Sequence, residues 1–119
     1  ISHHGKDEAK LKQLAEIEIG QMELLNELLQ GLNDVEENNG TLLDNTMVLY
    51  GCHMGDANIH NNKNLPVILA GGGFKHGQHL AFNSDNNAPL ANLYVSMLQN
   101  MGLDRSKFAS STGTLTGLS

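Results

Sequence analysis

Hydrophobic residues recur at three- and four-residue steps in the first third of the chain and predict a long amphipathic helix over residues 6–35. The stripe consists of Leu11, Leu14, Ile17, Met22, Leu25, Leu28, Leu29 and Leu32. Charged residues such as Lys12 and Glu16 fall outside it, so one face of the helix is expected to pack on a sheet. Gly20 and Gly31 weaken the helix interior, and the helix is expected to end or bend near Gly31.

Two short apolar runs follow, at residues 47–50 and 66–70, and both are predicted as strands. The second run is apolar at every position, which is typical of a parallel strand covered on both faces. A polar loop separates the two strands, and three glycines at residues 71–73 allow a sharp exit from the second one. Residues 34–40 are interpreted as a solvated turn, and residues 74–82 as a turn leading into a further short strand.

A second helix is predicted near the C-terminus, with Pro89 in its first turn and Gly102 as its stop. Its apolar face consists of Leu90, Leu93, Tyr94, Met97, Leu98 and Met101. Residues 104–119 are rich in Ser, Thr and Gly and are expected to form an extended tail, packed on the body or free in solvent.

These elements predict a single α/β domain over residues 1–119, folded as a partial α/β/α sandwich with a mostly parallel sheet. A chain of 119 residues supports one core, and two Tyr, three Phe and no Trp leave that core to Leu, Ile, Val and Met. The net charge of −6 opposes attraction to nucleic-acid phosphates. No apolar run approaches the roughly 20 residues of a membrane span.

The candidate chemistry lies in the histidines and one aspartate of the loop between the two strands. Neutral imidazole and carboxylate are ligands that zinc prefers, so His53, Asp56 and His60 form a candidate metal site. Their spacing leaves a second interpretation open, in which they are solvated loop residues and Asp56 is a turn or cap residue. The single cysteine, Cys52, is interpreted as a small buried hydrophobe at the end of a strand rather than as a nucleophile.

Several longer motifs occur in a recognisable order: SHHG, the long helix, GTLLDNTMVLYG, the polar loop, LPVILAGGG and PLANLYVSMLQNMG. In this order the chain resembles the C-terminal part of an uncharacterised family of exported bacterial proteins, which is related to the alkaline phosphatase and sulfatase-like superfamily. The resemblance implies an α/β/α sandwich with metal-binding loops at the C-terminal ends of its strands. It also implies export to the periplasm or beyond the cell, and phosphate- or sulfate-ester hydrolysis as the ancestral chemistry.

Carried over to this sequence, the metal motifs of the relatives fit in part. Residues 2–4, Ser-His-His, resemble an Asp-Thr-His metal motif, with His4 at the position of the metal-binding histidine. The Asp-His-Gly metal loop falls on residues 53–55, where Met54 replaces a histidine and is a poor ligand for zinc or magnesium. Asp56 would compensate by a shift in the loop, and His60 falls near a later metal-binding histidine.

The resemblance thus implies a divalent-metal site, with zinc as the expected ion. Its members would be His4, His53, Asp56 and His60. The superfamily's nucleophile has no counterpart in this chain, which opens at Ile1 without an initiator Met and is expected to be the C-terminal fragment of a larger alkaline-phosphatase-like domain.

Two functional hypotheses follow, and they require different partners. In the first, the chain is the metal-binding part of a hydrolase-like protein whose N-terminal half is its partner, and histidines from the chain start and from the loop meet at one point. In the second, the site is degenerate and the chain is a non-catalytic structural or self-assembling module, a homo-oligomer formed through an exposed sheet edge.

Overall fold

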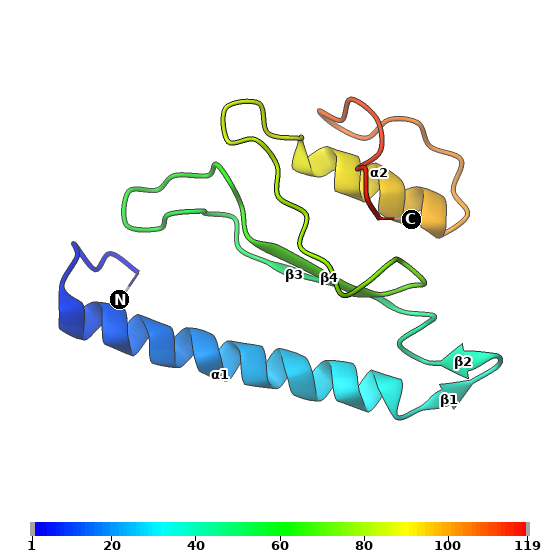
Figure 1. Cartoon of the computed structure of the whole chain (residues 1–119), viewed down its shortest axis with the longest axis horizontal. Coiled ribbons are helices and arrows are strands. Elements are labelled where there is room, and N and C mark those ends of the chain that lie inside the picture. The colour runs from blue at the N-terminus through cyan, green and yellow to red at the C-terminus, as the bar shows by residue number, and fades with distance from the viewer. Residues whose placement is uncertain (1, 119) are drawn as a thin grey trace.

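Two helices lie on opposite sides of a small antiparallel sheet in the computed structural model, which describes residues 2–118 (Figure 1). The elements in chain order are α1 (Glu8–Asn33), β1 (Glu36–Glu37), β2 (Gly40–Thr41), β3 (Met47–Gly51), β4 (Val67–Gly71) and α2 (Leu90–Asn100). The strands form two separate pairs, β1 with β2 and β3 with β4.

The long helix predicted from the N-terminal stripe is confirmed. Asp7 caps its start, because one carboxylate oxygen accepts a hydrogen bond from the Lys10 backbone amide at 3.0 Å. The helix continues through Gly31 and ends at Asn33, where the amide of Asp34 still donates to the carbonyl of Gln30 at 2.9 Å. The predicted end near Gly31 is therefore confirmed to within two residues.

Both strands of the central pair are confirmed, but their predicted direction is wrong. β3 and β4 are antiparallel, with Met47 opposite Gly71 and Gly51 opposite Val67. Parallel neighbours need a crossover connection, usually a helix, whereas residues 52–66 form turns and return the chain directly. The apolar run does not reflect cover on both faces either, since Ile68 in β4 is 42% exposed. The predicted partial α/β/α sandwich with a mostly parallel sheet is thus corrected to two helices and two small antiparallel pairs.

Two further local predictions also change. Residues 34–40, predicted as a solvated turn, belong to a short hairpin that extends to Thr41, in which Glu36 pairs with Thr41 and Glu37 with Gly40. Residues 74–82, all within the described part of the chain, have irregular backbone where a strand was predicted.

The core of the molecule is centred on α2, where the buried hydrophobic residues are Ala91, Leu93 and Val95. The predicted second helix is confirmed, and so is its stop, because Gly102 has a φ of +80° and the amide of Leu103 bonds back to the carbonyl of Leu98. The following tail packs on α2 as far as the described residues extend; Ser119 lies outside them.

Two buried polar side chains of α2 hold this tail in place. The side-chain oxygen of Asn92 accepts a hydrogen bond from the Thr112 backbone amide at 2.8 Å. The Ser96 hydroxyl oxygen accepts one from the Leu115 backbone amide at 2.9 Å. Both side chains are less than a tenth exposed, so these bonds satisfy polar groups that water cannot reach.

In contrast to α2, α1 is attached to the rest of the molecule on one side only. None of its residues, all of which the structure describes, is buried. Its half-buried leucines are Leu14, Leu25, Leu29 and Leu32. The Tyr50 hydroxyl of β3 donates to the Gln21 side-chain oxygen at 3.0 Å, and the Leu43 amide donates to the carbonyl of Leu32 at 3.1 Å. The expected packing of one helix face toward a sheet is present, but the cover is partial.

Candidate metal site

The loop between β3 and β4 is closed by a backbone bridge between Asp56 and Asn61. The Asn61 amide donates to the carbonyl of Asp56 at 2.9 Å, and the amides of Gly55 and Asp56 both donate to the carbonyl of Asn61. A Cβ at Gly55 would collide with the carbonyl oxygen of Lys63, so a glycine is required at this crossing. His60 lies just inside the bridge, with a left-handed φ of +54°.

The N-terminal segment folds against this loop. The Gly5 amide donates to the Asn58 side-chain oxygen at 2.7 Å, and the Asn58 amide in turn donates to the Asp56 carboxylate at 2.9 Å. Next to these bonds, the Nε2 atoms of His3 and His60 are 3.1 Å apart, with ring centroids 4.7 Å apart and the rings inclined by 67°. Two histidines 57 positions apart in the sequence therefore share one point on the surface.

The distance between the two nitrogens is compatible with two chemical states. One neutral imidazole can donate a hydrogen bond to the other, with the tautomers chosen accordingly. Alternatively, both nitrogens can ligate one ion, because two ligands of a tetrahedral zinc, each about 2.0–2.1 Å from the metal, lie about 3.3 Å apart. The observed 3.1 Å needs only a small opening to reach that value.

The residues predicted for the metal site are placed as follows. His60 contacts His3 rather than His4, whose Nδ1 accepts a hydrogen bond from the Lys6 amide at 3.0 Å. Asp56 lies in the same loop and holds the Asn58 amide, and His53 is exposed. Among residues 2–118, no three His, Cys, Asp or Glu side chains form a group that could hold a metal ion.

His3 was missed as a ligand candidate because the resemblance pointed to its neighbour. The signal available in the sequence was the pair His3-His4 itself, since either residue could have faced the loop. The left-handed backbone at Gly5 and Lys6, with φ of +56° and +65°, turns the chain sharply at this point.

The other candidate residues have ordinary roles. Cys52 is exposed, so its interpretation as a buried hydrophobe is wrong; it lies one residue beyond the end of β3. His76 Nε2–H donates to the carbonyl of Gly71 at 2.9 Å and thereby ties residues 74–78 to the end of β4. His79 is exposed.

The clearest electrostatic effect lies at the opposite end of β3 from the loop. The Asp44 carboxylate accepts hydrogen bonds from the Thr41 amide at 2.7 Å and from the Thr41 hydroxyl at 3.0 Å. These bonds, the backbone one first, lower the pKa of Asp44 below its ordinary value because they favour the ionised form.

Comparison of the chain with protein-family models, with curated proteins and with solved structures finds no match. Within residues 2–118, neither helix is long and apolar enough to cross a membrane.

Proposed function

We propose that this chain binds a divalent transition-metal ion, with zinc as the expected ion, between its N-terminal turn and the β3–β4 loop. The observation that supports this proposal is the 3.1 Å approach of His3 Nε2 to His60 Nε2. The bonds from Gly5 to Asn58 and from Asn58 to Asp56 hold the two segments together beside the histidines. The candidate ligands therefore belong to backbone that is fixed by contacts other than the ligands themselves.

The two histidines would supply half of a tetrahedral coordination shell. Asp56 is the nearest acidic residue along the loop, and its carboxylate already accepts the Asn58 amide, which orients it. The remaining positions are open to water, to an ester oxygen or to a ligand from another polypeptide. The proposal extends to an exported protein resembling the alkaline phosphatase and sulfatase-like superfamily, in which the N-terminal half of the parent protein provides a nucleophile. In that setting a bound zinc would supply Lewis-acid polarisation of a phosphate- or sulfate-ester oxygen.

Zinc titration of the purified chain by calorimetry, followed by metal analysis after gel filtration, tests the metal proposal. We expect one zinc ion per chain and at least a tenfold loss of affinity in His3→Ala and in His60→Ala, since each substitution removes one of two nitrogen ligands. His79→Ala is the matched control, because His79 is equally an exposed histidine.

A further variant separates the geometry from the resemblance. His4→Ala should retain zinc if His3 is the ligand, and should lose it if the resemblance assigned the correct histidine. Absence of zinc binding to the unmodified chain, or unchanged affinity in His60→Ala, would refute the metal proposal.

A second function, that of a non-catalytic structural or self-assembling module, is favoured by the amount of exposed surface. The molecule exposes 8611 Å², whereas a compact monomer of the same 12.9 kDa exposes about 6,300 Å². The excess of about 2,300 Å² is of the size that an obligate protein–protein interface covers. A chain of this kind is expected to complete its core against another polypeptide.

A further inference from the structure

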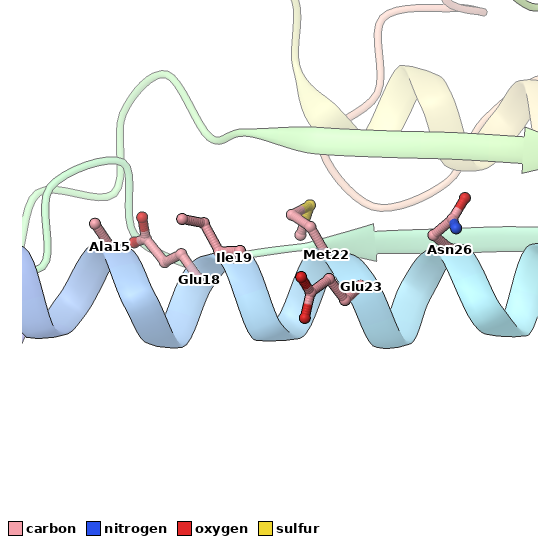
Figure 2. Close-up of a pocket in the computed structure, with 6 residues that line it drawn as sticks. All are labelled: Ala15, Glu18, Ile19, Met22, Glu23 and Asn26. Carbon is pink, nitrogen blue, oxygen red and sulfur yellow. The ribbon is translucent and has the colours of Figure 1, made fainter.

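A shallow groove runs along one flank of α1 (Figure 2). It has a volume of about 490 Å³ and is lined by Ala15, Glu18, Ile19, Met22, Glu23 and Asn26. The side chains of Ala15, Ile19, Met22 and Asn26 project from the same edge of the helix in Figure 2. Ile19 is 59% exposed and Met22 is 38% exposed, so the apolar part of the groove faces solvent.

We infer that this groove is a self-association surface, on which two copies of the chain pair their α1 helices in antiparallel orientation around Ile19. The inference gives the second candidate function a specific surface and a specific partner. It does not depend on metal binding, because His3 and His60 lie outside the groove.

The spacing of the lining residues favours a helix as the partner. Ala15, Ile19, Met22 and Asn26 follow one another at steps of four, three and four residues, which is the seam pattern of two helices packed along their length. At 3.6 residues per turn, Ile19 lies about a third of a turn around α1 from Leu25, one of the leucines that α1 partly buries. The groove is therefore a second apolar strip, beside the strip that the molecule itself covers.

The same residues are complementary to themselves when two copies run antiparallel. With Ile19 opposite Ile19, the large Met22 of one copy lies about one residue, or about 1.5 Å, from the level of the small Ala15 of the other. A large side chain therefore packs beside a small one across the seam. A parallel pair would instead place Met22 opposite Met22 and Ala15 opposite Ala15, which alternates crowded and empty layers.

The charges along the helix favour the antiparallel orientation as well. In that register Lys12 of one copy lies level with Asn26 of the other, between Glu23 and Glu27. Lys12 of each copy thus lies beside Glu23 and Glu27 of the other copy. The two-fold symmetry places one such cluster at each end of the seam. In a parallel pair Glu18 of one copy would instead flank the seam beside Glu23 of the other, which is repulsive.

The whole molecule exposes more surface in excess of a compact monomer than a stable pair covers. A standard stable interface covers about 800 Å² on each partner, which is less than half of the roughly 2,300 Å² by which this chain exceeds a compact monomer. The seam residues, from Ala15 to Asn26, extend along about 17 Å of α1.

Sedimentation equilibrium of the full chain in EDTA, over a hundredfold range of concentration, tests this inference. We expect a reversible dimer, and we expect Ile19→Glu to raise the dimer dissociation constant at least a hundredfold. Leu24→Glu is the matched control, because Leu24 is 66% exposed on the opposite flank of the same helix. This variant should dimerise like the unmodified chain. Circular dichroism of both variants checks that α1 remains folded.

A charge exchange tests the orientation. Lys12→Glu and Glu23→Lys should each weaken the dimer at least tenfold, and the double variant should recover most of the loss because the pair is restored across the interface. A monomer at all concentrations would overturn the inference, and so would an oligomer that Ile19→Glu leaves intact, as pairing through the β3–β4 edge would give. His60→Ala should leave the dimer unchanged. The zinc titration therefore tests the metal proposal alone, and the sedimentation experiment tests the self-association surface alone.

Discussion

Gly71 is a residue that local conformation and long-range packing constrain together. It has a φ of +73° and is buried at the end of β4. A Cβ at this position would collide with the carbonyl oxygens of Thr46 and Leu43, which belong to the chain entering β3. Gly71 thus lets the end of β4 lie directly against that entering segment.

This constraint gives a stability prediction. Gly71→Ala should lower the free energy of unfolding by more than about 2 kcal/mol, because it adds a steric collision to the cost of a left-handed φ. Gly73→Ala is the control, since Gly73 has the same φ of +73° with no atom within 4 Å of the added Cβ, and should cost about 1 kcal/mol. Urea denaturation of both variants measures the difference, and equal losses would show that the close approach has no energetic weight.

Asp44 gives a prediction about pH. Its pKa is lowered in the folded chain by the two hydrogen bonds from Thr41, so the ionised form is favoured by folding. The stabilising contribution is therefore present above the ordinary pKa of an aspartate and is lost as the pH falls through the lowered value.

Carbon-detected NMR titration of the Asp44 carboxyl group measures this effect directly. Thr41→Val removes the hydroxyl donor but keeps the amide, so the pKa of Asp44 should move part of the way back toward its ordinary value. A pKa that does not change in Thr41→Val would mean that the side-chain bond contributes nothing.

Among the elements, the helices were the easiest to predict from sequence. The apolar period and the Gly102 stop act over a few neighbouring residues, so they were predicted without the rest of the chain. The Asp7 cap is equally local, but only the structure identified it. The direction of β3 against β4 was not readable in this way. An apolar strand has the same sequence pattern whether its neighbour is parallel or antiparallel. Here the turns of residues 52–66 connect β3 to β4 directly, and the two strands are antiparallel.

Asn92 is one of the two buried side chains of α2 that hold the C-terminal tail. Asn92 is 7% exposed and exchanges hydrogen bonds with the backbone and side chain of Thr112. Asn92→Ala should lower the free energy of unfolding by about 1–3 kcal/mol, because it removes the part-buried hydrogen bonds between Asn92 and Thr112.

Hydrogen exchange locates this loss. The amides of Thr112 and Leu115 should exchange faster in Asn92→Ala, while those of β3 and β4 should keep their protection. Asn100→Ala, at the exposed end of the same helix, is the control and should leave the tail amides unchanged. Uniformly faster exchange over the whole chain would instead indicate that the tail and the sheet unfold as one unit.

At the scale of the whole molecule, the chain is more open than its length requires. Its radius of gyration is 16.6 Å, whereas a compact domain of this length has about 13.5 Å. The small buried core is confined to one side, around α2, while α1 presents Ile19 and Leu24 to solvent on its two flanks. An amphipathic helix with uncovered apolar residues on its flanks is typical of a helix inside a larger assembly, which supports the self-assembling module.

The sequence by itself determined the two helices, the Gly102 stop, the existence of the two central strands and the histidine-rich segments that carry the candidate chemistry. These features depend on residues a few positions apart, and their physics is local. Only the tertiary structure decided that β3 and β4 are antiparallel, that His3 rather than His4 meets His60, and that α1 stays uncovered. Each of these three features is a contact, or a missing contact, between segments far apart in the sequence, and such contacts depend on the packing of the whole chain.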